Sequence, residues 1–211
     1  PANCNYTITN NGGSLTVAKA TLDVTKLSVT ANDAVYDGNE KSATVTAGDL
    51  VGVGTITVLY SSTENTYTEA TPENVGTYYV FVTVAEGTNY EAVTEAYTGA
   101  SFKITPAQVT IPTAATNLVY NGSAQTGVAD GDLYTVSGNV QTNAGGYTAT
   151  ATLDDKANYV WAGTNSSENQ TISWSIEKLS ISGASITLSS TSLVYNGDEQ
   201  TVSVTNATVT A

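Results

Sequence analysis

The side chains with the best prospect of acid–base or metal chemistry in this sequence are carboxylates that lie close together. There are two such pairs, Asp130 with Asp132 and Asp154 with Asp155. Histidine is absent and Cys4 is the single cysteine, so histidine-based triads, Cys-His nucleophiles and histidine metal sites are excluded. Both acid pairs fall in expected turns, where aspartate bonds backbone amides, and we favour that role over a Ca²⁺ site. We therefore expect no enzyme activity, no metal and no cofactor.

Aromatic side chains offer a second kind of chemistry, because an exposed ring can stack on a sugar. The chain has 13 tyrosines but only 2 tryptophans and 2 phenylalanines. Trp161 lies two residues after Tyr159, on the same side of a regular strand, and these two are the weak candidates for glycan stacking. The favoured interpretation is that Trp161 and Trp174 form a core instead. A glycan- or mucin-binding module is thus the alternative function.

The charge balance excludes several partners. Six lysines and no arginine stand against 19 acids, which gives a net charge of −13 and a pI near 4.1. Such a chain repels phosphate backbones, so nucleic acid is excluded as a partner. No apolar run approaches the ~18 residues that cross a bilayer, so we expect no membrane insertion in this segment. Cys4 has no partner for an internal disulfide, and we interpret it as a small buried residue rather than a link between chains.

The elements that would position these side chains repeat along the chain. The segment LVYNG at 118–122 has close copies at 34–38 (AVYDG) and 193–197 (LVYNG), so Tyr36, Tyr120 and Tyr195 are 84 and 75 positions apart. Asn-Gly and Asp-Gly readily adopt the positive φ of a tight turn, so each copy predicts strand, turn, strand. The abundance of Thr, Val and Tyr favours sheets and predicts almost no helix.

A second landmark is a Gly-x-Tyr strand preceded by asparagine, which contains Tyr78 in one copy and Tyr147 in the other. It looks like the segment of immunoglobulin-type sandwiches in which a tyrosine hydroxyl ties a loop to the next strand. We expect Tyr78 and Tyr147 to be mostly buried corner residues of this kind. Val80 and Ala149 stand where that fold has a cysteine, so its disulfide is absent. The predicted fold class is all-β, with tandem small Ig-like sandwich domains; a β-grasp-like or prealbumin-like arrangement remains the alternative.

The landmarks divide the chain into four parts: a closing hairpin at 1–20, full units at 21–106 and 107–178, and the opening of a further unit at 179–211. The spacing from Leu15 to Tyr36 and from Trp174 to Tyr195 is 21 in both cases, which predicts short constant connections and a semi-rigid array. We expect strands at 5–9, 14–19, 26–30, 42–47, 55–60, 76–85, 100–105, 108–111, 125–129, 133–136, 146–153, 159–162 and 170–177.

The two partial units require a cover for their apolar faces. One hypothesis is an excerpt from a longer array of repeats. The other is head-to-tail strand complementation, in which residues 182–211 of one copy pair with residues 1–20 of the next and propagate a filament. That composite domain would be 23 residues short of a full unit and would lack the Gly-x-Tyr strand. The expected partners are therefore neighbouring repeats or copies of the chain itself.

The ordered combination of VYDGNEKSATV at 35–45, the Gly-x-Tyr strand, Asn-Tyr and a closing Phe/Trp-x-Ile resembles the MBG and YDG repeats of very large bacterial surface proteins. The resemblance covers nearly the whole chain and implies Ig-like or β-grasp-like stalk and adhesin modules. It implies an extracellular or cell-surface location in a bacterium, with a glycan or host surface among the partners. The expected function is an extracellular structural or adhesive repeat protein that forms a stalk or filament.

Overall fold

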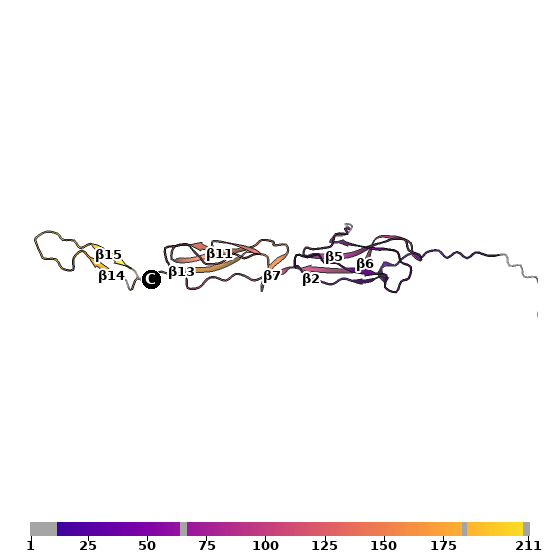
Figure 1. The fold of residues 1–211 in the computed structure, drawn as a ribbon, viewed down its shortest axis with the longest axis horizontal. Helices are drawn as coiled ribbons and strands as arrows, with labels where there is room; N and C mark the ends of the chain where they lie inside the picture. The colour runs from indigo at the N-terminus through magenta and orange to yellow at the C-terminus, as the bar shows by residue number, and fades with distance from the viewer. Residues whose placement is uncertain (1–11, 64–66, 183–184, 209–211) are drawn as a thin grey trace, which may run out of the picture. The chain divides into compact units, whose positions relative to one another are not determined.

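The computed structural model describes residues 12–63, 67–182 and 185–208 and is all-β, apart from a short 3₁₀ turn, η1 (Val24–Lys26). The chain divides between Ala107 and Gln108 into two compact units (Figure 1). Each unit is described by itself.

The first unit is built on a four-stranded sheet in the order β2-β6-β5-β4. These strands are β2 (Ala34–Val35), β4 (Ile56–Ser61), β5 (Gly76–Val84) and β6 (Val93–Thr105). Neighbours are antiparallel except β2 and β6, which run parallel with Ala34 opposite Ile104. A second, antiparallel pair consists of β1 (Ser28–Thr30) and β3 (Thr44–Thr46).

The core of the first unit lies between these two layers. Successive side chains of β5 alternate between the two faces of the sheet, and Val80, Val82 and Val84 on the inner face are fully buried. Val80 packs with Phe102 and Ile104 of β6, and the half-buried Val29 and Val45 of the second layer pack against this cluster. The alternation therefore directs Tyr79 and Phe81 to the outer face.

The second unit has a three-stranded antiparallel sheet in the order β13-β11-β9. Its strands are β9 (Tyr134–Ser137), β11 (Gly145–Leu153) and β13 (Gln170–Ile176). Two further pairs accompany it: β8 (Gln125–Thr126) with β10 (Val140–Gln141), and β7 (Ala107–Val109) with β12 (Tyr159–Trp161). Its core combines Trp161 and Trp174 with small residues, and Ala149 has no exposed surface.

Each unit has the same kind of backbone contact between an early segment and its last strand. In the first, the Tyr36 amide donates to the Thr105 carbonyl at 2.8 Å, and in the second the Tyr120 amide donates to the Glu177 carbonyl at 2.9 Å. Both contacts belong to parallel pairings between an early segment and the end of the unit's last strand. Tyr78 stands opposite Phe102, and Tyr147 opposite Trp174.

Beyond the second sheet, β14 (Ser185–Leu188) pairs with β15 (Val204–Thr208). Leu188 stands opposite Val204, seven positions before and nine after Tyr195, and in the first unit Val29 stands opposite Val45, seven before and nine after Tyr36. The register of β1 and β3 therefore recurs at this one pair, before a register shift between Thr187 and Leu188. The exposure of the two strand pairs differs. Ile186 is 61% and Val204 58% exposed, whereas Val29 and Val45 are half-buried. Among the described residues, no sheet covers β14 and β15.

Several expected strands differ from the structure. Residues 12–19 carry no strand, so the strand expected at 14–19 is absent; the expected strand at 5–9 and Cys4 lie outside the described residues. The strand expected at 26–30 begins with η1, because the Asp23 side chain accepts from the Thr25 amide and caps the turn. β6 starts seven residues earlier than expected. The short strand β2 is the one expected before the turn at 37–38, whereas β10 was not expected, since two residues show no hydrophobic alternation.

Candidate functional site

One aspartate of each acid pair, Asp130 and Asp155, accepts hydrogen bonds from nearby backbone amides. One Asp130 carboxylate oxygen accepts the Val136 amide at 2.6 Å. Asp155 accepts the Ala157 and Asn158 amides at 3.0 and 3.2 Å and the Asn158 side-chain amide at 2.8 Å. The side-chain bond from Asn158, helped by the backbone bonds, lowers the pKa of the Asp155 carboxyl below its ordinary value. Within the described residues, no group of three or more acidic, cysteine or histidine side chains could hold a metal ion.

The Tyr-Asx-Gly segments form the predicted turns in all three copies. The side chains of Asp37, Asn121 and Asn196 each accept the backbone amide two residues on, at 2.9, 2.9 and 3.0 Å. The glycine that follows has a positive φ of 74°, 80° and 90° respectively. In the first copy the two strands next to the turn do not pair with each other, because β2 joins β6 while β3 joins β1.

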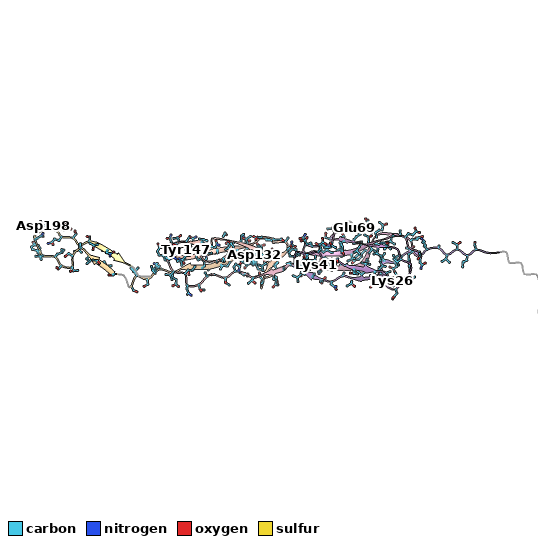
Figure 2. All side chains as sticks on the ribbon, viewed as in Figure 1. Lys26, Lys41, Glu69, Asp132, Tyr147 and Asp198 are labelled. Carbon is cyan, nitrogen blue, oxygen red and sulfur yellow. The ribbon has the colours of Figure 1, made fainter. Side chains whose placement is uncertain are left out.

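The three tyrosines that precede these turns differ in burial. Tyr36 packs against the core of the first unit, Tyr120 is 39% exposed and Tyr195 is 90% exposed. The exposure of Tyr195 follows from the missing cover of β14 and β15, whose joining loop carries Tyr195 and Asp198 (Figure 2).

The corner tyrosines make the expected hydrogen bonds. The Tyr78 hydroxyl donates to the Asn74 carbonyl at 2.9 Å, and the Tyr147 hydroxyl to the Asn143 carbonyl at 2.6 Å. Both rings are half-buried rather than mostly buried. Burial raises the pKa of the Tyr78 hydroxyl.

The glycine of each Gly-x-Tyr motif has a packing role. A Cβ on Gly145 would lie 3.2 Å from the Tyr147 hydroxyl oxygen, and one on Gly76 would lie 3.2 Å from the Tyr78 ring. The ring therefore covers the glycine two residues before it, which explains why the two residue types occur together.

The glycan candidates from the sequence occupy the core of the second unit. Trp161 has no exposed surface, its Nε1 donates to the Glu168 carbonyl at 2.9 Å, and its ring lies 5.5 Å from that of Tyr134. A fully buried ring cannot stack on a sugar, so the hypothesis for Trp161 is wrong. Tyr159 is half-buried against the same core, in agreement with the favoured core interpretation.

An exposed aromatic cluster lies instead on the outer face of the first unit's sheet. Its members are Tyr67, Tyr79, Phe81 and Tyr97, which we call the aromatic face. Ring centroids are separated by 4.6 Å for Tyr67 and Phe81, 5.1 Å for Phe81 and Tyr97, and 6.0 Å for Tyr79 and Tyr97. Tyr79 is 40% and Tyr97 43% exposed.

A bulge in β6 places Tyr97 in this cluster. Tyr79 stands opposite Ser101 but Phe81 stands opposite Tyr97, so β6 carries extra residues between these pairs. Within the bulge Gly99 has φ of 86°, and the buried Thr98 hydroxyl donates to the Val80 carbonyl at 2.7 Å. Bulges re-aim side chains, and here the result is one tyrosine in contact with two rings of β5.

A pocket of about 230 Å³ opens on the aromatic face. It is lined by Ser61, Thr63, Tyr79, Phe81 and Tyr97, a set that contains no charged side chain. The Ser61 hydroxyl, which is buried, donates to the Thr63 carbonyl and so fixes the loop at the rim. The pocket thus combines aromatic walls with a hydroxyl-bearing edge.

Sequence reasoning missed this site, although part of it is visible in the chain. Aromatic residues at 79 and 81 alternate with valines at 80 and 82, a pattern that puts two rings on one face of a strand. Tyr97 and Tyr67 carry no comparable signal, because their approach depends on a bulge and a loop.

The chain matches no protein-family model, no curated protein and no solved structure. Along the described residues, no helix has the length and apolar character needed to cross a bilayer.

Proposed function

We propose that this chain is a structural segment of an extracellular bacterial surface protein, made of tandem Ig-like β units that withstand tension as a stalk or filament. The observation that carries the proposal is the parallel contact between the start and the end of both units, Tyr36 to Thr105 and Tyr120 to Glu177. It occurs at corresponding positions of two sequences that otherwise differ.

The parallel arrangement has a mechanical consequence. A force that pulls the two ends of a unit apart drives β2 and β6 past each other along their length. Backbone hydrogen bonds of a parallel pair then share the load, instead of breaking one after another as in a hairpin opened from its end. A second parallel contact reinforces the entrance of the first unit, because Ala20 bridges Tyr90 with bonds to Asn89 and Glu91 of 2.9 and 3.0 Å.

The Ig-like assignment is supported by two layers around a core and by the hydroxyl bonds of Tyr78 and Tyr147 to the loops that precede them. The resemblance to MBG and YDG repeats supports the bacterial surface location. The net charge of −13 suits a soluble surface exposed to solvent.

The same proposal assigns β14 and β15 to a further unit. The pair Leu188 and Val204 has the register of Val29 and Val45, and the apolar side chains of both strands are exposed. In the first unit the last strand of the covering sheet contains the apolar–polar–apolar triplet Phe102-Lys103-Ile104. Residues 15–17 have the same triplet pattern, and there Leu15 is 91% and Val17 84% exposed. In a head-to-tail contact, the Tyr195 amide of one copy would meet the Ala18 carbonyl of the next, the counterpart of Thr105.

Single-molecule pulling tests the mechanical role. The chain with Cys4→Ser is held through cysteines introduced at Ala20 and Pro106, so that the force shears β2 against β6. The matched control holds it at Thr55 and Ala85, whose backbone bond of 2.9 Å lies at the open end of the β4–β5 hairpin, so that pairs break singly.

We expect the first geometry to require at least about twice the force of the second, and to release about 300 Å of chain, less the folded length, when the unit opens. Equal forces in the two geometries would contradict a role in withstanding tension.

A further inference from the structure

The aromatic face has no counterpart in the second unit, although the frame is the same. Tyr78 and Tyr147 align through their partners Phe102 and Trp174, so Tyr79 corresponds to Thr148 and Phe81 to Thr150. The residue opposite Phe81 is Tyr97, while the residue opposite Thr150 is Thr171. Threonines at all three positions support the same sheet, so the fold does not require the rings.

The bulge that completes the cluster is also confined to the first unit. β11 and β13 pair without interruption from Gly145 opposite Ile176 to Ala151 opposite Gln170. The distortion in β6 includes Glu95 at φ 50° and Gly99 at φ 86°. A non-glycine residue at positive φ is unfavourable and persists only where the surroundings impose it. The first unit therefore carries exposed rings beside a shifted strand register, whereas the corresponding β11–β13 ladder has neither, and this combination is typical of a binding site.

We infer that the pocket on the aromatic face binds a neutral sugar ring, stacked on the exposed rings of Tyr79 and Tyr97 beside Phe81. A pyranose presents a face of C–H groups, which are attracted by the negative faces of aromatic rings, and a rim of hydroxyls. The two tyrosine hydroxyls and Thr63 can exchange hydrogen bonds with that rim.

The size and charge of the site decide between ligand classes. Its volume of about 230 Å³ lies below the ~300–1,000 Å³ of pockets for drug-sized ligands, which suits one or two sugar rings. Four partly exposed rings supply at most about 400 Å², against the ~800 Å² per partner of a stable protein interface. The lining is uncharged and the chain carries −13, so acidic glycans are disfavoured.

This inference does not depend on the proposed mechanical role, because the sheet resists force whether or not the face is occupied. Loss of sugar binding and loss of mechanical resistance are measured in separate experiments. If both hold, the first unit is an adhesive module within a structural array.

Saturation-transfer NMR on the full chain tests the inference with two neutral trisaccharides, triacetylchitotriose and cellotriose. We expect at least one of them to receive saturation on the C–H groups of one ring face, and trigalacturonate, an anionic trisaccharide, to receive none. Tyr79→Thr and Tyr97→Thr install the residues that the second unit carries and should each weaken binding about tenfold, the loss expected for one stacked ring.

Two controls keep the result interpretable. Thr148→Ala changes the position in the second unit that corresponds to Tyr79, and Tyr195→Thr removes a tyrosine that is 90% exposed elsewhere; neither should alter binding. No transfer from either neutral trisaccharide at millimolar concentration would overturn the inference, as would binding that survives both variants of the aromatic face. A change of oligomeric state on Tyr79→Thr without sugar binding would assign the face to a second copy instead.

Discussion

Tyr147 joins a loop to the sheet of the second unit by one hydrogen bond and one ring contact, and these can be removed separately. Tyr147→Phe deletes the hydroxyl that donates to the Asn143 carbonyl at 2.6 Å but keeps the ring. Asn143 is exposed, so water can replace the lost donor, and the net cost should be about 1 kcal/mol.

Tyr147→Ala also removes the ring, whose centroid lies 4.9 Å from that of Trp174. The pair contributes about 1 kcal/mol beyond burial. Deletion of a fully buried aromatic ring costs about 3–5 kcal/mol, and half-burial reduces this figure. We therefore expect a total of about 3 kcal/mol for Tyr147→Ala.

The assay is urea unfolding followed by tryptophan fluorescence. Both tryptophans, Trp161 and Trp174, lie in the core of the second unit, so the signal reports that unit within the full chain. With a slope of about 1–2 kcal/mol per molar urea, Tyr147→Phe should lower the midpoint by about 0.5–1 M and Tyr147→Ala by about two to three times as much.

Tyr78→Phe removes the matching hydroxyl bond in the first unit and should leave the tryptophan transition in place. The corner role would be refuted if Tyr147→Phe and Tyr147→Ala were both neutral, or if they cost the same.

Three further predictions follow from single contacts. Gly127→Ala would place a Cβ 1.9 Å from Trp174 and should destabilise the second unit by about 2–3 kcal/mol in the same fluorescence assay, whereas Gly146→Ala, with nothing within 4 Å, should cost well under half of that; equal costs would contradict the packing. Because its folded pKa lies below the ordinary 3.8, Asp155 stabilises the second unit fully above about pH 5, and this contribution is lost as the pH falls through the lowered pKa. Asp155→Asn should therefore flatten the fall of the tryptophan midpoint below about pH 5, and an unchanged fall would contradict this role. The uncovered β14–β15 layer should cause concentration-dependent association in sedimentation velocity that Ile186→Asp removes; loss of association with Val17→Asp as well would identify residues 12–20 as the partner, and a monomer at every concentration would contradict both.

The features that were predicted correctly from the sequence depend mostly on short local motifs. The turn at Asn121-Gly122 and the hydroxyl bond of Tyr147 depend on residues within four positions, so the sequence determines them directly. The all-β class follows from composition, because Thr, Val and Tyr favour strands wherever they occur. The pairing of β2 with β6 was not foreseen, because it joins segments 70 residues apart and leaves no period in either of them.

The candidate site was misplaced for a related reason. Trp161 has the residue type of a binding platform, but it is buried in a cluster with residues of four other strands, β7, β9, β11 and β13. Tyr97 acquires its place from a bulge whose extra residues look like ordinary strand in the sequence.

The parallel contact that closes each unit also determines when that unit can fold during synthesis. Thr105 leaves the ribosome about 70 residues after Tyr36, so the hydrogen bond between the Tyr36 amide and the Thr105 carbonyl cannot form until the whole unit has been made. Contacts this distant in sequence make folding slow, and the apolar inner faces stay open in the meantime. The pair β14 and β15, with Ile186 and Val204 open to solvent, has the form that a nascent unit would have at that stage. An array of such units is therefore most vulnerable to misassembly with its neighbours at each moment when one unit is half emerged, and the sequence differences between successive units reduce that risk.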